Sequence, residues 1–275
     1  MWNLSGFSDE IAADFEEQCS HIRGLGMSYL EFRSAWDTNV LALSDDQLAT
    51  VKQTLQRHQL TVSCIGSPVG KSSIEGDFEP VLEQMRTAAR IAGELGTRYI
   101  RIFSFYLPEG ADPANYRTEV IRRLSALAQI AETHGLVLLH ENEVGIYGDI
   151  PQRCHDLVTS VDSPHLRLTW DPANFVHSGV APFDDGYALL RPFVEYLQIK
   201  DAVAATGAVV AAGRGDAQVA QTIRALHFDG FDGFFSLEPH LGRSTGFGGF
   251  SGPELFSDAW GAFTSLVTKE GIDIS

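Results

Sequence analysis

Cysteine and long apolar runs are scarce in this sequence, and both absences are informative. Cys19, Cys64 and Cys154 are the three cysteines in 275 residues; they are an odd number, widely separated, and form no CxxC pair. This usage is unlike a disulfide framework and fits a reducing compartment. The apolar stretches fall well short of the roughly 18–20 residues that span a membrane. No charged, apolar, small-residue leader opens the sequence. We therefore expect a cytoplasmic protein without a membrane partner.

Positive charge is also scarce. The chain has 20 Lys and Arg residues against 36 Asp and Glu residues, for a formal net charge of −16, and no basic run interrupts the acidic excess. Such a chain repels a phosphate backbone, so we expect no nucleic-acid partner. The acidic residues are spread over predicted helix faces, where they favour solubility and identify no substrate.

Apolar segments of strand type alternate with segments of helical periodicity along the whole chain. The strands are predicted at residues 2–7, 29–33, 61–65, 99–103, 137–141, 166–170, 194–199 and 234–237. The helices are predicted at residues 14–25, 44–58, 78–95, 116–134, 150–161, 187–193, 216–226 and 251–269. Eight strand-helix units of this kind predict an α/β fold with a parallel sheet, a single (β/α)8 TIM barrel formed by residues 1–275. The glycine-rich stretch 242–252 is expected to be a mobile loop at the mouth of the barrel.

Polar side chains follow four consecutive predicted strands at the point where each strand ends. They are Glu141, Asp171, Gln198 and Glu238. The carboxyl ends of parallel barrel strands meet on one face, and neighbouring strands lie roughly 4.8 Å apart. We predict that these four residues bind one divalent cation. An all-oxygen set favours Mn2+ or Mg2+, with Co2+ or Zn2+ as further possibilities. The alternative is four polar residues satisfied separately in their own loops.

Such a cation would polarise a substrate carbonyl and acidify the neighbouring C–H bond. A carboxylate beside it could then remove the proton and form an enediolate. Glu141 and Glu238 come from the fifth and eighth strands, so they could approach a substrate from two sides. We predict that these two glutamates are the catalytic acid and base.

At these residues the chain resembles the xylose isomerase-like TIM-barrel superfamily of sugar-phosphate isomerases and epimerases, which includes D-tagatose 3-epimerase, hydroxypyruvate isomerase and inosose dehydratase. The matching stretches are His140-Glu141-Asn142-Glu143, Trp170-Asp171-Pro172-Ala173-Asn174-Phe175, Gln198-Ile199-Lys200-Asp201, Ser236-Leu237-Glu238-Pro239-His240 and Gly213-Arg214-Gly215-Asp216. The resemblance covers essentially the whole chain and implies the same four metal ligands, with the two glutamates as acid and base.

Two departures from the family pattern limit what the resemblance implies. Tagatose-type epimerases usually carry His where this chain has Gln198, whereas hydroxypyruvate isomerase resembles this chain in carrying Gln. The zinc-dependent endonucleases of the superfamily need a His at the position of Asn174. Together with the acidic charge, Asn174 argues against a DNA-repair nuclease.

Six further residues are predicted to contact substrate: Lys200, His240, Asn174, Glu143, Arg214 and Arg101. For Lys200 an ion pair with a nearby carboxylate is an equally good interpretation. Arg101 could instead form a salt bridge with Glu31 below the site, because a charged residue inside a barrel is costly unless it is paired. The remaining four occupy predicted loops near the mouth, where a surface role is the alternative.

The sequence is compatible with three functions. The leading one is a metal-dependent isomerase or epimerase of a small sugar or hydroxy-carbonyl compound. The second is a lyase or dehydratase on a keto-polyol such as an inosose, which shares the proton abstraction but then loses a hydroxyl group. The third is a non-catalytic sugar-binding barrel, in which Gln198 has cost the site its metal. In each case the expected partner is a small carbohydrate, and by analogy with other barrels the chain could form a homo-oligomer.

Overall fold

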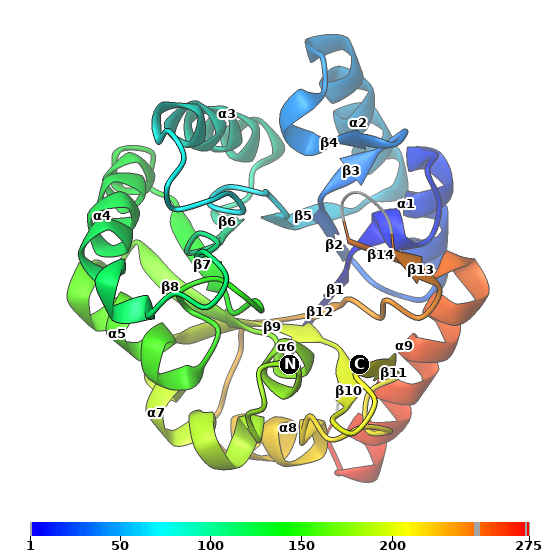
Figure 1. The fold of residues 1–275 in the computed structure, drawn as a ribbon. Helices are drawn as coiled ribbons and strands as arrows, with labels where there is room; N and C mark the ends of the chain where they lie inside the picture. Colours follow the sequence, from blue (N-terminus) through cyan, green and yellow to red (C-terminus); the bar gives the residue numbers. More distant parts are fainter. Residues whose placement is uncertain (1, 245–247, 273, 275) are drawn as a thin grey trace.

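The computed structural model describes residues 2–244, 248–272 and 274, and it confirms the predicted (β/α)8 barrel. Eight parallel strands follow one another around the ring shown in Figure 1. They are β1 (Asn3–Gly6), β2 (Tyr29–Phe32), β5 (Thr61–Ile65), β6 (Tyr99–Ile102), β7 (Val137–Glu141), β8 (Leu166–Trp170), β9 (Val194–Ile199) and β12 (Phe234–Leu237). A parallel bridge between Phe7 and Glu31 joins the two ends of the sheet. Every predicted strand lies within one residue of its observed bounds.

Helices form the outer layer of the ring (Figure 1). The long ones are α1 (Phe15–Gly24), α2 (Asp45–His58), α3 (Glu79–Leu95), α4 (Arg117–Thr133), α5 (Pro151–Val161), α8 (Val219–Phe228) and α9 (Gly252–Lys269). Ser44 and Gln47 form a reciprocal capping box at the start of α2. This arrangement satisfies two backbone donors that the first turn would leave unpaired.

The sixth and seventh units depart from the predicted helices. The segment 187–193 is not one helix: the chain forms α6 (Pro172–His177), a π-helical turn η4 (Phe183–Tyr187), α7 (Ala188–Leu190) and a 3-10 turn η5 (Arg191–Phe193). Pro192 has no N–H to continue a helix through this segment. The helix predicted from residue 216 begins at Val219, because Ala217 donates its N–H to Asp201 and Gln218 adopts a left-handed φ of 53°.

Short hairpins and turns surround the mouth of the barrel. The hairpins β3 (Ser34–Ala35) with β4 (Thr38–Asn39), β10 (Asp201–Val203) with β11 (Ala208–Val210), and β13 (Arg243–Ser244) with β14 (Gly249–Phe250) follow β2, β9 and β12. The 3-10 turns are η1 (Ser8–Glu10), η2 (Val40–Ala42) and η3 (Pro113–Asn115). Strands of two or three residues leave no periodic signal in the sequence. The mobile loop predicted at 242–252 falls partly on residues 245–247, which lie outside the described residues.

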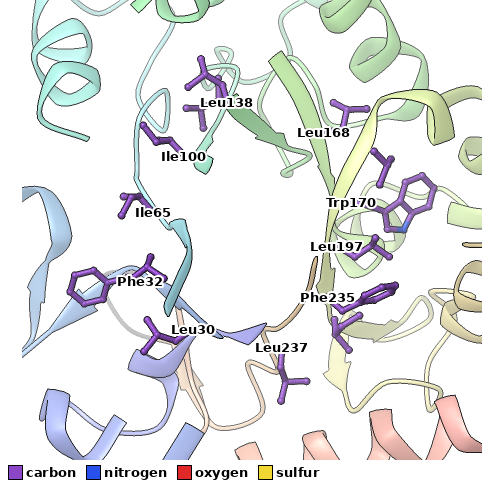
Figure 2. Close-up of a cluster of buried hydrophobic side chains, with 14 of the residues drawn as sticks. Leu30, Phe32, Ile65, Ile100, Leu138, Leu168, Trp170, Leu197, Phe235 and Leu237 are labelled. Carbon is purple, nitrogen blue, oxygen red and sulfur yellow. The ribbon is translucent and has the colours of Figure 1, made fainter. Parts of the chain in front are cut away.

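Alternation along the strands separates the apolar layer beneath the helices from a barrel interior that holds the charged residues and a small separate apolar cluster. Figure 2 shows side chains such as Ile100, Leu138 and Leu197 directed from the strands toward the surrounding helices. Their neighbours Arg101, Leu139 and Gln198 therefore face inward, since successive side chains of a strand point to opposite faces. Trp170 and Leu237 also point outward, which directs Asp171 and Glu238 into the barrel mouth.

No helix in the described ranges is both long enough and apolar enough to cross a lipid bilayer. The cysteines Cys19, Cys64 and Cys154 are free and buried.

Phe235 offers a direct test of the layer between barrel and helices. It is 1% exposed and stacks on Trp2 with ring centroids 4.1 Å apart. Phe235→Ala should lower the free energy of unfolding by about 3–5 kcal/mol, because it removes a buried ring and leaves a cavity. Phe228→Ala is the matched control: this ring is 91% exposed, and its loss should cost less than about 0.5 kcal/mol. Denaturant unfolding measures both, and equal effects would contradict the proposed packing.

Candidate metal centre and substrate cavity

The four residues predicted as metal ligands meet at the mouth of the barrel. Glu141, Asp171 and Glu238 each place a carboxylate oxygen within 4.8 Å of the others, and all three side chains are buried. Gln198 is also buried, and its amide nitrogen donates to Glu141 Oε2 over 3.4 Å. Its amide oxygen has no hydrogen-bond partner among the described residues. Buried polar atoms are normally paired, so this free acceptor fits a ligand for a cation.

Asn142 couples the ends of β7 and β8. Its side-chain nitrogen donates to the Asp171 carbonyl over 2.8 Å, and its side-chain oxygen accepts the Asp171 N–H over 3.0 Å. Asp171 Oδ1 then accepts the Asn174 N–H and caps α6. The two hydrogen bonds from the Asn142 side chain to the Asp171 backbone, together with the helix cap, therefore orient Asp171 toward the barrel axis. Sequence reasoning gave Asn142 no role, although it stands directly after the predicted ligand Glu141.

Three cations lie against the carboxylates. Lys200 Nζ is 2.5 Å from Asp171 Oδ2 and 3.2 Å from Glu238 Oε2. Arg101 lies 3.0 Å from Glu141 and 3.7 Å from Glu238. Among the described residues, the salt bridges of Arg101 are therefore with the site; the alternative salt bridge to Glu31 is not formed, although Arg101 still acts on Glu31 electrostatically. Arg33, which was not among the predicted site residues, is 3.0 Å from Glu238 Oε1 and 2.8 Å from Asp9.

Burial and neighbouring charge separate the acidities of the two glutamates. Burial raises the pKa of Glu141 to about 8, with Glu238 adding to the shift and Arg101 opposing it. Burial also acts on Glu238, but Lys200, His240 and Arg33 outweigh it and hold its pKa well below the usual value. For Asp171, burial raises the pKa to about 6 against the pull of Lys200. These neighbours therefore separate the two glutamates in acidity, with Glu238 the more acidic and Glu141 the less acidic of the pair.

A second cluster joins the first strand to the last. Glu10 Oε2 accepts the His240 N–H over 2.9 Å and the Ser251 hydroxyl over 2.8 Å. His240 Nε2 is 3.3 Å from both Glu10 Oε1 and Glu238 Oε1. These contacts hold His240 in a left-handed conformation with φ of 48°. Sequence reasoning missed Glu10, but a signal was present, because Ser8, Asp9 and Glu10 follow the first predicted strand as Glu141 follows the fifth.

A cavity of about 500 Å3 opens above the carboxylates. Of the predicted substrate contacts, it is lined by Lys200, His240, Asn174, Glu143 and Arg101. Arg214 is exposed and lines a separate groove against α9, so the structure does not bring it to the site. Lys71, which sequence reasoning did not identify, also lines the cavity and pairs with Glu143 over 2.9 Å.

The Gly213–Asp216 turn has a structural role. Asp201 accepts backbone N–H bonds from Ala202, Gly213, Gly215 and Ala217, at 2.8–3.0 Å. A Cβ on Gly215 would lie 2.4 Å from Asp201 Oδ1. The turn therefore needs glycine at this position, and it anchors the loop that follows Lys200.

Comparison with known proteins places this barrel in a family. The profile of the xylose isomerase-like TIM barrel matches residues 19–258. The chain belongs to this family. One relative, a 3-dehydroshikimate dehydratase of Bacillus anthracis, is 25% identical over 129 residues, covering 47% of this chain and 46% of the relative. A second, a 2-epi-5-epi-valiolone 7-phosphate 2-epimerase of Actinoplanes, is 30% identical over 158 residues, covering 58% and 55%. The chain thus spans about half the length of these relatives.

A solved structure shares the fold over most of its length. It is a xylose isomerase-like TIM barrel protein from Mycobacterium smegmatis in complex with magnesium, with a TM-score of 0.71 and 22% identity. The match covers 93% of this chain and 89% of the other.

Glu31, which is buried inside the barrel, predicts a pH dependence of stability. Burial raises its pKa from 4.5 to about 7, although Arg101 opposes the shift. Between these pH values the unfolded state loses this proton before the folded state does, so stability falls as pH rises. The loss should reach about 3 kcal/mol near pH 7. Glu31→Gln should remove it in chelator-treated protein unfolded by urea at pH 5 to 8.

Glu16→Gln is the control of opposite sign. Hydrogen bonds from His58 and Arg57 lower the pKa of this exposed carboxyl, so its contribution is lost only as pH falls below 4.5, and from pH 5 to 8 the Glu16→Gln profile should run parallel to that of wild type. If the unfolding free energies of wild type and Glu31→Gln instead changed in parallel with pH, Glu31 would not be the cause of the loss of stability.

Proposed function

We propose that this protein is a metal-dependent isomerase or epimerase that acts on a small sugar or hydroxy-carbonyl compound through an enediolate. The observation that carries the proposal is the convergence of the buried carboxylates of Glu141, Asp171 and Glu238 beside Gln198, whose amide oxygen has no hydrogen-bond partner among the described residues. Buried carboxylates are costly unless they are paired or bind a metal. The epimerase among the relatives supports the reaction class, and the magnesium complex of the M. smegmatis protein supports a divalent cation.

The donor set fits a hard divalent cation. Glu141, Asp171, Gln198 and Glu238 would hold it through oxygen atoms, which suits Mn2+ or Mg2+ better than the nitrogen and sulfur ligands typical of zinc. When bound, the cation would polarise the substrate carbonyl and lower the pKa of the adjacent carbon acid.

The protein groups supply the proton transfers. Glu238, which is kept ionised by Lys200, His240 and Arg33, is suited to remove the proton. Glu141 lies across the site and is suited to return one. Return to the opposite face of the same carbon gives an epimer, and return to the neighbouring carbon gives an aldose-ketose isomer. Asn174 and His240 line the cavity and can orient hydroxyl groups.

Elimination is the second candidate, and the 25% identity to a 3-dehydroshikimate dehydratase favours it. The proton abstraction by Glu238 would be the same. A dehydratase must also protonate a leaving hydroxyl group, and His240, 3.3 Å from Glu238 and facing the cavity, is placed to do so. Incubation with ketoses and keto-inositols in deuterated water separates the two outcomes: deuterium enters the product of an isomerase, whereas a dehydratase forms a product lighter by one water.

Glu238→Gln should lower turnover by about a thousandfold or more, since it removes the base and leaves the side-chain volume unchanged. The fold should persist, because the amide replaces the carboxylate isosterically. Glu195→Gln is the matched control. Glu195 lies on the barrel strand β9, but it pairs with Arg98 and Arg167 and does not line the cavity. Near-normal turnover in Glu238→Gln would overturn the assignment.

Metal content tests the site independently of any substrate. Protein purified without added metal should contain one Mn2+, Mg2+ or similar ion per chain. After chelation, re-addition of Mn2+ should raise the thermal midpoint, because a ligand that binds the folded state stabilises it. Asp171→Asn should weaken this shift. Absence of both metal and shift would favour the non-catalytic sugar-binding barrel, with Gln198 as the reason.

A further inference from the structure

Lys200 occupies an unusual position for a cation. Its side chain is buried, and its ammonium contacts Asp171 Oδ2 and Glu238 Oε2, which belong to two of the four residues that would hold the metal. An ammonium and a divalent cation repel each other, and both would draw on the negative charge of the same two carboxylates, whose oxygens lie 2.5 and 3.2 Å from Nζ. Metal binding and the observed position of Lys200 are therefore in competition.

The other two cations of the site are held by additional groups. Arg33 binds Asp9 and the Gly249 carbonyl, and its guanidinium lies 4.5 Å from the Phe7 ring centroid. Arg101 binds the Gly66 carbonyl and lies 5.0 Å from the ring centroids of Phe7 and Phe103. Within the described ranges, the ammonium of Lys200 contacts only Asp171 and Glu238. Lys200 is thus the cation free to move, on a flexible four-carbon stem.

The cavity provides the place to which the ammonium can move. Lys200 lines it together with Asn174 and His240. If a divalent cation neutralised Asp171 and Glu238, the Lys200 ammonium would lose its two partners at the edge of a buried site. A buried charge without a partner is costly, so the arrangement favours a ligand that brings or develops negative charge beside the metal.

We propose that Lys200 is an internal counter-ion that a divalent cation displaces, and that its released ammonium then pairs with the negatively charged oxygen of the substrate. The inference rests on the proposed metal-dependent function. It assigns Lys200 two partners in sequence: the ligand carboxylates before metal binding, and the enediolate oxygen afterwards.

Mn2+ affinity measured by isothermal titration calorimetry tests the first half. Lys200→Met keeps the length of the side chain and removes its charge, so it should bind Mn2+ about tenfold or more tightly than wild type. Lys52→Met is the control, because this exposed lysine on α2 pairs only loosely with Glu94, 3.7 Å away. Its Mn2+ affinity should equal that of wild type.

Equal or weaker Mn2+ affinity in Lys200→Met would overturn the counter-ion role and leave the metal site standing. No Mn2+ binding in wild type or in either variant would overturn the proposed function itself.

Acetohydroxamate, a bidentate mimic of an enediolate, tests the second half. In Mn2+-loaded protein, Lys200→Met should bind this anion about tenfold more weakly than wild type and Lys52→Met do. Equal binding in all three would overturn the pairing with substrate.

A crystal structure of Mn2+-loaded wild type provides a measurement that needs no variant to fold. The Lys200 ammonium should lie beyond ion-pair distance, about 4 Å, from Asp171 Oδ2. An intact contact of the present length beside the bound metal would overturn the proposal.

Discussion

The structure depends on the balance between buried carboxylates and buried cations at the mouth of the barrel. Glu141, Asp171 and Glu238 would repel one another at their observed separations, and burial alone would protonate them. Lys200, Arg101 and Arg33 counter this repulsion, each within 3.0 Å of a carboxylate oxygen. A chain with a net charge of −16 thus places three cations beside the buried carboxylates at the barrel mouth.

The barrel makes this balance possible by separating two layers. Outward side chains such as Leu138 and Phe235 pack against the helices and hold the strands in register. The inward positions can then carry charged residues, because oppositely charged side chains on other strands offset the free-energy cost of burying them. Asn142 shows how the two layers connect: it links the end of β7 to the backbone of Asp171, so the direction of a ligand follows from the position of a strand.

The ionisation states of the two glutamates follow from which cations each one meets. Glu238 is surrounded by Lys200, Arg33 and His240, whereas Glu141 has Arg101 as its close cation. Two residues of the same type therefore differ in acidity, which is the arrangement that acid-base chemistry requires. In the proposed mechanism, a divalent cation that displaced Lys200 would alter this difference and would so couple metal binding to proton transfer.

Alternating periodicity and strand-end carboxylates sufficed to predict the barrel and the meeting of Glu141, Asp171, Gln198 and Glu238, because both follow from local patterns and a parallel sheet brings equivalent strand ends together. The substrate contact predicted for Arg214 was not supported, since the turn that carries it is held by Asp201 and faces α9. Only the tertiary structure decided which charges pair. Arg33 meets Glu238 across 205 residues, and Glu10 meets the His240 N–H across 230. Such pairings depend on the distances between loops that follow different strands, and no periodicity along the chain encodes those distances.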